Sequence, residues 1–460
     1  MNPVIYKNYD IRGVVPDHLN YYDAELLGKA YGMYVKSKFG DRVVIGHDNR
    51  KTSPELKDKF VFGLMSVGCH VTDVGLSLTP TIQFLTHDKR FDAGVIVTAS
   101  HNPSNYNGFR FCGRKAEPIF GEQILQIKEI AEQGVFPHEN GSVNYDDLNP
   151  LYIEHLASLF TFKKRLRVLI DCGNGTSSAF ASTLYSRLGI NFETLFCNLD
   201  GDYPHGVPDP ENNLFMKTLS QKVVEGGFDA GFAFDTDSDR FGVVDEKGNV
   251  YSNDKMLLFL AEDLLKTQKG AVLFDVKSTE TLGIRVKELG GEPRMIRTGH
   301  PYFLKGLREG ALIGGEYSGH MFYGSGYLGY DDGIFASLKV LEVLSSLDTS
   351  LSEFMQKYPK TYHTDEIKVP IPESEKPKRI EDVKRLALDD PKVVRRVEVD
   401  GIRAYLNQTD WVVIRSSNTT PIFSVRMEAQ SKEGLQDLAE FAMRLLPELK
   451  PEMLVPIHFS

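Results

Sequence analysis

The chain has 460 residues, of which 41% are hydrophobic and 25% are charged. These proportions exclude a disordered chain, a collagen-like fibre and a membrane-embedded protein, and the length predicts several domains. A formal net charge of −10 argues against nucleic acid as the main partner, because a phosphate backbone requires a basic surface. The charge still allows a small phosphorylated ligand that a few cations hold.

The N-terminal segment and the cysteines indicate a reducing compartment. No apolar signal core follows Met1, and no run approaches the roughly 18 apolar residues of a membrane span. The cysteines form no CxxC motif and no Cys/His cluster, so their spacing indicates neither a zinc site nor a redox dithiol; they are Cys69, Cys112, Cys172 and Cys197. We therefore expect a cytoplasmic protein with no membrane partner.

Short apolar runs alternate with helical patterns, which predicts βαβ units and mostly parallel sheets. A helix is expected at 54–67, with Pro54 in its first turn and Gly68 after its end. In six places a predicted strand leads into a polar loop; the strands are 43–46, 94–97, 168–170, 230–234, 271–274 and 311–314. Ligands bind beyond the carboxyl ends of strands in open α/β sheets, so we expect one composite site.

Breaks in this pattern suggest where domains begin and end. Polar or turn-rich segments lie near 145–150, 248–254 and 360–370. The tail has an α+β pattern, with a helix at 375–389, strands around 411–428 and a helix at 432–446. We therefore expect four domains, at 1–148, 149–251, 252–363 and 364–460.

The loop after the strand 94–97 carries a candidate nucleophile. Its sequence TASHNP places Ser100 beside His101, and Arg110 follows in NYNGFR. A serine in this position can accept a phosphoryl group, and an arginine is a suitable phosphate ligand. The alternative is a capped turn whose serine only bonds backbone amides.

The loop after the strand 230–234 carries a candidate metal site. Its sequence DTDSDR presents Asp235, Asp237 and Asp239 at alternate positions, which suits Mg²⁺ or Ca²⁺. An EF-hand is the obvious competitor, but Arg240 stands where its glycine belongs, and the flanks predict strands rather than helices. A solvated acidic turn is the remaining alternative.

Two later loops suit a phosphorylated sugar. GEYSGH places Glu316, Ser318 and His320 at alternate positions, where a carboxylate and a hydroxyl can bind vicinal sugar hydroxyls. RSSNTTP at 415–421 combines a guanidinium with hydroxyls and backbone amides, a set that binds phosphate. Either loop can also be an ordinary polar turn, and His300 in RTGHPYFLK is ambiguous alone.

Taken together and in this order, the motifs resemble the α-D-phosphohexomutases, and more narrowly the bacterial phosphomannomutase/phosphoglucomutase group. The resemblance covers essentially the whole chain, through YDIRG (9–13), GHDNR (46–50), TASHNP (98–103), DCGNG (171–175), DTDSDR (235–240), DVKST (275–279), TGH (298–300), GEYSGH (315–320), GYDDGI (329–334), RSSNTTP (415–421) and VRMEA (425–429). It implies an α/β fold with four domains around a central cleft. Three of them would be related α/β domains with mixed sheets, and the C-terminal one would be α+β.

The resemblance also implies roles for individual residues. The catalytic residues would be Ser100 (as phosphoserine), His101, Arg12, Arg110 and His300. One Mg²⁺ would be bound by Ser100, Asp235, Asp237 and Asp239. The substrate would be bound by Tyr9, Arg240, Lys277, Thr298, Gly299, Glu316, Ser318, His320, Arg415, Ser417, Asn418 and Thr419.

Two positions depart from the family pattern in ways that bear on the reaction. Arg110 stands where many relatives carry lysine, and an arginine stays protonated, so proton transfer is expected from His101 or His300. Tyr317 stands where methionine or asparagine is common, which can alter contacts to the sugar hydroxyls.

The expected reaction is reversible phosphoryl transfer between C1 and C6 of a hexose phosphate, through a hexose 1,6-bisphosphate that also serves as activator. The SNTT loop at 417–420 favours mannose and glucose phosphates over glucosamine phosphate, so phosphoglucosamine mutase or another phosphohexomutase specificity is the alternative. A metal-dependent sugar phosphatase would have little use for the RSSNTTP loop. A catalytically silent binding protein would have lost Ser100 or the aspartates. We expect a monomer, with a dimer as the alternative.

Overall fold

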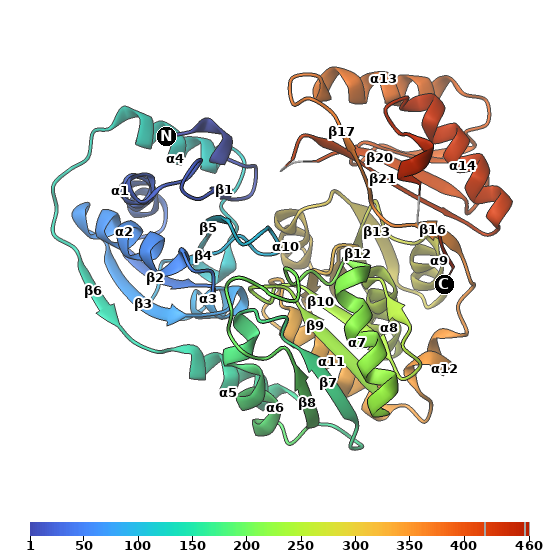
Figure 1. The fold of residues 1–460 in the computed structure, drawn as a ribbon, viewed down its shortest axis with the longest axis horizontal. Helices are drawn as coiled ribbons and strands as arrows, with labels where there is room; N and C mark the ends of the chain where they lie inside the picture. The colour runs from blue at the N-terminus through green and yellow to red at the C-terminus, as the bar shows by residue number, and fades with distance from the viewer. Residues whose placement is uncertain (418–419, 455–456, 460) are drawn as a thin grey trace.

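A computed structural model describes residues 1–417, 420–454 and 457–459. The chain forms four sheets, one after another along the sequence, and helices cover them (Figure 1). In Figure 1 the first sheet (blue) and the last (red) lie on opposite sides of the second and third. The expected four-domain α/β architecture is thereby confirmed, while the domain limits stay a prediction. No helix among these residues combines the length and apolarity needed to cross a membrane.

The first sheet has the order β1-β5-β4-β2-β3-β6, in which β4, β2, β3 and β6 are parallel and β1 and β5 are antiparallel to their neighbours. Its strands are β1 (Ile11–Val14), β2 (Arg42–His47), β3 (His70–Leu76), β4 (Ala93–Val97), β5 (Tyr106–Gly113) and β6 (Ser142–Tyr145). Its helices are α1 (Tyr21–Lys38), α2 (Ser53–Ser66), α3 (Thr79–Leu85) and α4 (Glu122–Gln133). The central strand β4 is buried along its whole length, which explains its continuous apolar sequence.

The second and third sheets share one hydrophobic cluster, to which Phe232, Phe259 and Leu338 belong. The second sheet, of order β11-β10-β9-β7-β8, comprises β7 (Arg167–Asp171), β8 (Asn191–Leu195), β9 (Ala230–Phe234), β10 (Phe241–Asp245) and β11 (Val250–Tyr251), with α5 (Asn149–Leu159), α6 (Ala181–Arg187) and α7 (Asn213–Gly226). The third, of order β13-β12-β14-β15, comprises β12 (Ala271–Asp275), β13 (Glu292–Ile296), β14 (Ile313–Gly315) and β15 (Met321–Tyr323), with α8 (Asn253–Thr267), α9 (Glu280–Glu288), α10 (His300–Arg308), α11 (Gly333–Ser346) and α12 (Leu351–Met355).

The same local feature recurs in these three sheets. A strand that pairs in parallel on one side turns back through a short loop into an antiparallel neighbour, at β4–β5, β9–β10 and β14–β15. The loops are 98–105, 235–240 and 316–320, which carry the serine, the aspartates and the GEYSGH motif. The sheets are therefore mixed, which confirms what the family resemblance implied, whereas the alternation of apolar runs with helical patterns had suggested mostly parallel sheets.

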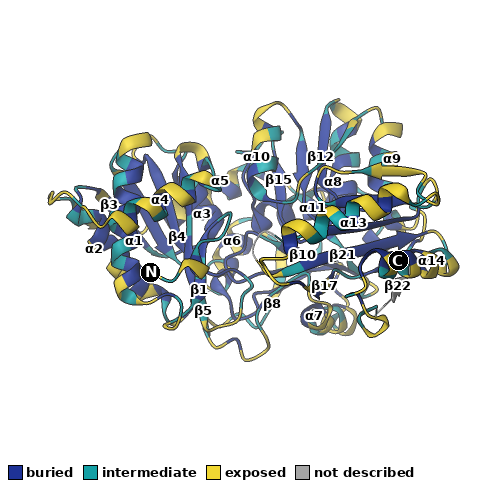
Figure 2. Ribbon diagram, turned by 90° about the horizontal axis from the view of Figure 1, so that it is seen from above, coloured by how far each residue is buried: buried dark blue, intermediate teal, exposed yellow. Residues whose placement is uncertain are grey.

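The fourth sheet is antiparallel throughout its described pairs. It comprises β16 (Tyr362–Thr364), β17 (Ile367–Pro370), β18 (Arg395–Val397), β19 (Ile402–Tyr405), β20 (Trp411–Ser416), β21 (Ile422–Ala429) and β22 (Ile457–Phe459), with α13 (Lys376–Asp389) and α14 (Lys432–Leu445). Figure 2 shows that the inner strands of the sheets, such as β4, β9, β12 and β20, are largely buried, whereas the outer faces of the helices are exposed. This is the burial expected of sheets covered by amphipathic helices.

Two buried arginines attach the fourth sheet to the third. Arg403 donates to the carbonyl oxygens of Val276 (2.9 Å) and Ser278 (2.7 Å), and Arg426 donates to that of Lys277. Both guanidinium groups are fully buried, so these bonds are shielded from water. The DVKST loop of the third sheet is thereby held from two strands of the C-terminal domain.

Candidate active site

Ser100 lies on the loop between β4 and β5, in a conformation that few non-glycine residues adopt. Its φ is 48°, and its amide donates to Thr98 Oγ1 at 2.9 Å. Its Oγ donates to Asp235 Oδ2 at 2.7 Å and lies 3.2 Å from His101 Nδ1. This loop, residues 98–105, is called the serine loop below, and the DTDSDR loop of the second sheet, residues 235–240, is called the metal loop after its candidate site. The serine loop therefore directs the serine oxygen at the metal loop. Strained backbone of this kind is typical of functional sites.

Two arginines hold the serine loop in place. Arg12 donates to Ala99 O (3.1 Å) and to Asn102 Oδ1 (2.9 Å). The fully buried Arg50, from the GHDNR motif, donates to four loop carbonyls, those of Ser100, Asn102, Pro103 and Tyr106. Sequence reasoning included GHDNR among the motifs but assigned no role to Arg50, because nothing local shows which distant carbonyls it reaches.

The three aspartates of the DTDSDR loop are buried and face one another. Oxygen atoms of Asp235, Asp237 and Asp239 lie within 4.8 Å of one another. Burial raises the pKa of Asp235 and of Asp237, and the neighbouring carboxylates raise both further. Thr79 Oγ1 donates to Asp237 Oδ2 at 2.5 Å, whereas the buried Oδ1 atoms of Asp237 and Asp239 have no hydrogen-bond partner among the described residues. Converging buried oxygens without partners fit a divalent cation.

Arg110 closes one side of this acidic cluster. It donates to both carboxylate oxygens of Asp331, at 2.8 and 2.7 Å, and pairs with Asp239. His320 Nδ1 lies 3.0 Å from Asp331 Oδ2. On the other side of the imidazole ring, Arg240 Nε donates to His320 Nε2 at 3.0 Å. Sequence reasoning missed Asp331; the GYDDGI motif was the signal that pointed to it. A two-point ion pair keeps Arg110 protonated, as expected from the residue type.

The environment of the two candidate proton carriers, His101 and His300, favours their neutral forms. Burial lowers the pKa of His101 well below its usual value, and Arg240 and Arg12 lower it further. Burial also lowers the pKa of His300, with Arg110 as the second cause. His101 lies beside the serine oxygen, whereas His300 begins α10 and lines a small cavity with Arg110.

The GEYSGH loop meets the TGH loop in the third sheet. Gly299 N donates to Glu316 Oε1 at 2.5 Å, and Ser318 Oγ donates to Glu316 Oε2 at 3.2 Å. Tyr9, from the first domain, donates to Thr298 O at 3.1 Å. The predicted residues of these two loops therefore lie together, next to the N-terminal YDIRG segment.

The C-terminal domain brings the RSSNTTP loop to the same region. Asp400 Oδ2 accepts from Arg415 Nε (2.7 Å) and from Thr298 N (3.2 Å), so it bridges the fourth and third sheets. Lys376 donates to Ser417 O at 2.7 Å and fixes the start of the loop. Asn418 and Thr419, both predicted phosphate ligands, lie outside the described residues.

Lys277 makes a second contact between these two domains. Its Nζ lies 3.3 Å from Glu366 Oε1, and both side chains are largely buried. Burial alone raises the pKa of Glu366, but Lys277, Ser424 and Arg415 outweigh it and lower the pKa to about 2. Lys277 therefore keeps its positive charge at the edge of the site.

Direct contacts link most of the predicted residues into one continuous site. The serine loop touches the metal loop, Arg240 of the metal loop touches the GEYSGH loop, and that loop touches TGH. TGH in turn reaches Arg415 through Asp400. The prediction of a composite site assembled from separate loops therefore agrees with their placement, although each residue's role stays a prediction.

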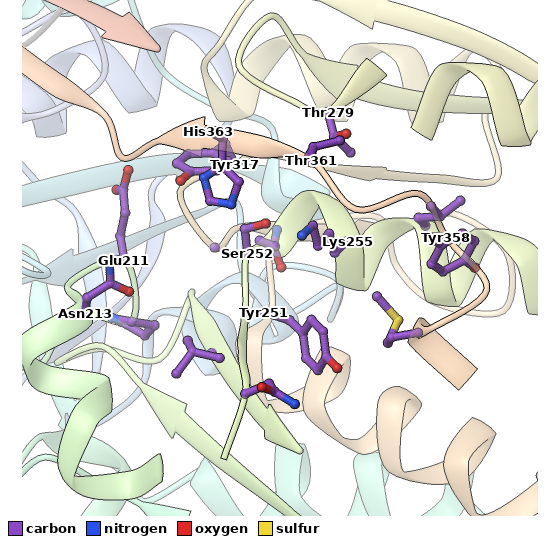
Figure 3. A pocket seen from close by; sticks show the side chains of 18 of the residues that line it. Glu211, Asn213, Tyr251, Ser252, Lys255, Thr279, Tyr317, Tyr358, Thr361 and His363 are labelled. Carbon is purple, nitrogen blue, oxygen red and sulfur yellow. The ribbon is translucent and has the colours of Figure 1, made fainter. Parts of the chain in front are cut away.

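A cavity of about 700 Å³ adjoins this site, and neither the serine loop nor the three aspartates line it. It is enclosed by β10, β11, the start of α8 and the segment 352–365, and Figure 3 shows Tyr251, Lys255 and Tyr358 on its wall. Ser318 is the predicted site residue that borders it. Tyr317 also lines it, with its ring under the Arg426 guanidinium at 4.1 Å. The tyrosine that departs from the family pattern is thus packed against the C-terminal domain.

Comparison with known proteins assigns the same four units. Models of the phosphoglucomutase/phosphomannomutase family match in chain order: α/β/α domain I at 3–138, domain II at 150–248, domain III at 252–362 and the C-terminal domain at 366–445. A phosphomannomutase/phosphoglucomutase of Pseudomonas syringae is 35% identical over 455 residues, which cover 98% of this chain and 97% of that protein. A phosphoglucomutase of Neisseria meningitidis is 34% identical over 457 residues, or 98% of each chain.

A solved structure agrees with these sequence matches. The crystal structure of a phosphoglucomutase/phosphomannomutase family protein from Burkholderia thailandensis superposes with a TM-score of 0.90 at 33% identity, covering 98% of this chain and 99% of that one. The chain belongs to the phosphoglucomutase/phosphomannomutase family. It is accordingly an enzyme of the isomerase class, a mutase of hexose phosphates.

Proposed function

We propose that the chain interconverts hexose 1-phosphates and hexose 6-phosphates through a phosphoserine at Ser100. The observation that carries this proposal is the 2.7 Å bond from Ser100 Oγ to Asp235, where the serine loop meets the metal loop. A serine oxygen beside a cluster of cation ligands and near two arginines suits phosphoryl transfer. In such reactions alignment and charge stabilisation supply most of the catalysis.

In the proposed cycle, phospho-Ser100 donates its phosphoryl group to the free hydroxyl of the bound sugar phosphate. The hydroxyl proton passes to a neutral histidine, for which His101 is the first candidate because its Nδ1 lies 3.2 Å from Ser100 Oγ. The hexose 1,6-bisphosphate turns end for end, and its other phosphoryl group returns to Ser100. His300 is the second candidate. Free bisphosphate acts as activator because it rephosphorylates a dephosphorylated serine.

The residues of the metal loop suit one Mg²⁺, which would stabilise charge on the transferring phosphoryl group. Asp235, Asp237 and Asp239 would hold it, with the Ser100 phosphate as a further ligand. The support is the pair of buried carboxylate oxygens that lack a hydrogen-bond partner among the described residues. Arg12 and Arg110 are the proposed cations on the reacting phosphate.

The remaining residues are assigned to the two ends of the substrate. Arg415, Ser417, Asn418 and Thr419 are proposed to bind the phosphate that does not react. Glu316 and Ser318 are proposed to bind sugar hydroxyls, and the path between is lined by Tyr9, Arg240, Lys277, Thr298, Gly299 and His320. The proposed functional unit is a monomer, with a dimer as the alternative. The proposed location is the cytoplasm.

We further propose that both mannose and glucose phosphates are substrates. The two sugars differ only at C2, whereas Glu316 and Ser318 are assigned to hydroxyls that both share. A ligand that turns end for end also presents C2 in two places, which disfavours a rigid contact there. The position of Tyr317 adds support. Its buried ring packs against Arg426 of the C-terminal domain, so we do not assign it a contact to the C2 hydroxyl.

Peptide mapping after incubation with glucose 1,6-bisphosphate tests the phosphoserine. We expect one phosphate on Ser100, and we expect Ser100→Ala to lose nearly all mutase activity. Ser104→Ala, on the exposed part of the same loop, is the matched control and should keep its activity. Phosphate on Ser104, or steady release of inorganic phosphate from hexose 1-phosphate, would contradict the mutase cycle, and the second result would favour a phosphatase.

A comparison of mannose 1-phosphate with glucose 1-phosphate under one set of conditions tests the substrate proposal. We expect kcat/KM values within about 30-fold, equivalent to about 2 kcal/mol of transition-state discrimination. N-acetylglucosamine 1-phosphate should be poorer than either, because its C2 substituent is bulkier. A preference above about a thousandfold for either epimer would instead require a buried polar contact to the C2 hydroxyl.

A further inference from the structure

Two cysteines that are distant in the sequence lie in contact at the end of the second sheet. Cys172 follows β7 and Cys197 follows β8, and these strands pair in parallel with Asp171 opposite Leu195. Cys172 N continues the ladder by donating to Leu195 O at 3.0 Å. The two Sγ atoms are 2.7 Å apart. The spacing of the cysteines in the sequence gave no sign of this contact, which arises from the register of the strands.

The two thiols differ in their access to solvent. Cys172 is fully buried, whereas Cys197 is partly exposed. The contact with Cys172 lowers the pKa of Cys197, although burial opposes this, and the same contact together with burial raises the pKa of Cys172. A partly exposed thiol of lowered pKa next to a buried partner is the arrangement of a reactive cysteine and its resolving cysteine.

We propose that Cys172 and Cys197 are an oxidation site that forms an intramolecular disulfide. The sulfur–sulfur bond is about 2.05 Å long, so the two sulfur atoms need to approach by only about 0.7 Å from their 2.7 Å separation. The Cys197 thiolate attacks hydrogen peroxide and displaces hydroxide, giving Cys197–SOH, and the hydroxide takes up the proton that the Cys197 thiol had lost to form one water. The Cys172 sulfur then displaces hydroxide, which takes up the Cys172 proton as a second water. Two thiols lose two electrons in total, the peroxide gains them, and a dithiol reverses the change.

The position of the pair in the fold indicates what the disulfide does. Cys172 belongs to the DCGNG loop, and just beyond that loop Thr176 N donates to Thr236 O of the metal loop at 2.9 Å. Thr176 Oγ1 also accepts from Asn49 N of the first domain at 3.1 Å. Because the sulfurs move so little, these bonds persist, and the oxidised enzyme stays active. The cross-link closes the chain between 172 and 197, which resists unfolding of the second sheet.

Peroxide treatment of the purified enzyme, followed by alkylation and digestion without reduction, tests the proposal. We expect a peptide that joins Cys172 to Cys197, with a mass loss of about 2 Da that dithiothreitol reverses. Mutase activity should stay within about twofold, and the unfolding temperature should rise by about 5 °C. Cys69 and Cys112 are buried at separate positions and should remain reduced, so they serve as internal controls.

Single variants separate the pair from general oxidation. In Cys172→Ser, Cys197 has no partner and should gain about 16 or 32 Da as the sulfenic or sulfinic acid. In Cys197→Ser, the buried Cys172 should stay reduced. The proposal is overturned if the wild-type protein gives the same sulfinic acid and no joined peptide under conditions that oxidise Cys197 in Cys172→Ser. A joined peptide accompanied by complete loss of activity would overturn the inference that the loop keeps its place.

Discussion

Replacement of Arg50 by lysine tests how the serine loop is positioned, because Arg50 donates to backbone carbonyls of that loop. Its guanidinium is fully buried and is the common donor to the carbonyls of Ser100, Asn102, Pro103 and Tyr106. A lysine keeps the charge but offers three donors on one nitrogen instead of a planar fork. We expect Arg50→Lys to fold and to bind substrate, with a lower kcat.

The magnitude follows from the bonds that a lysine cannot replace. Loss of two of the four carbonyl bonds to the buried guanidinium costs about 2–6 kcal/mol, at about 1–3 kcal/mol for each buried group left unsatisfied. This cost loosens the loop that holds Ser100 in its positive-φ conformation. A nucleophile displaced by as little as 1 Å can lose about a hundredfold in rate. We therefore expect kcat to fall by about 10- to 100-fold, with about 30-fold as the central value.

Steady-state kinetics with a hexose 1-phosphate, together with thermal unfolding, measures the effect. Arg42→Lys is the matched control, since Arg42 is 44% exposed and pairs with the buried Asp92 of the same domain, away from the serine loop. The control should keep its kcat within about twofold. An Arg50→Lys enzyme with the kcat and the unfolding temperature of the wild type would refute the positioning role.

Two further predictions concern the metal loop and the contact between the third and fourth sheets. Chelation should abolish turnover and Mg²⁺ should restore it. Asp237→Asn should need far more Mg²⁺ than the wild type for half-maximal activity. The control Asp58→Asn, at an exposed position, should need the same Mg²⁺ concentration as the wild type. The folded state lowers the pKa of Glu366 from 4.5 to about 2, so ionised Glu366 adds stability above pH 4.5 that is lost as the pH falls towards about 2. The difference in unfolding free energy between wild type and Glu366→Gln should therefore shrink between about pH 6 and about pH 3 in denaturant titrations, and a constant difference would contradict the assignment.

Much of the site was predictable because its residues follow predicted strands. Ser100 and the DTDSDR aspartates were each expected just after an apolar run, and the ends of neighbouring strands meet at one edge of a sheet. The antiparallel pairs β9–β10 and β14–β15 could also have been predicted from the sequence. Loops such as 235–240 and 316–320 are too short for a parallel crossover, which needs a dozen or more residues. The expectation of mostly parallel sheets overlooked that limit.

Other features depend on contacts that the local sequence does not encode. Arg50 acts on carbonyls some fifty residues further along, and Asp331 pairs with Arg110 across a sequence separation of 221 residues. Their motifs marked them as unusual, but no local rule assigns a partner over such a distance. The contact between Cys172 and Cys197 likewise depends on which strands pair and in which register.

The two buried arginines of the C-terminal domain, Arg403 and Arg426, limit how this domain can move relative to the third sheet. Arg403 and Arg426 donate to the carbonyls of residues 276–278. Separation of the two domains at this loop would leave three carbonyls and two guanidinium groups without these bonds. We therefore expect the loop to act as the pivot of any domain movement. Rotation of the C-terminal domain about residues 276–278 preserves those bonds, and the parts of that domain furthest from these residues move the most. For the proposed turnover of a bisphosphate we therefore expect a tilt, in which the RSSNTTP loop moves relative to the first domain while the contacts of residues 276–278 with the C-terminal domain persist.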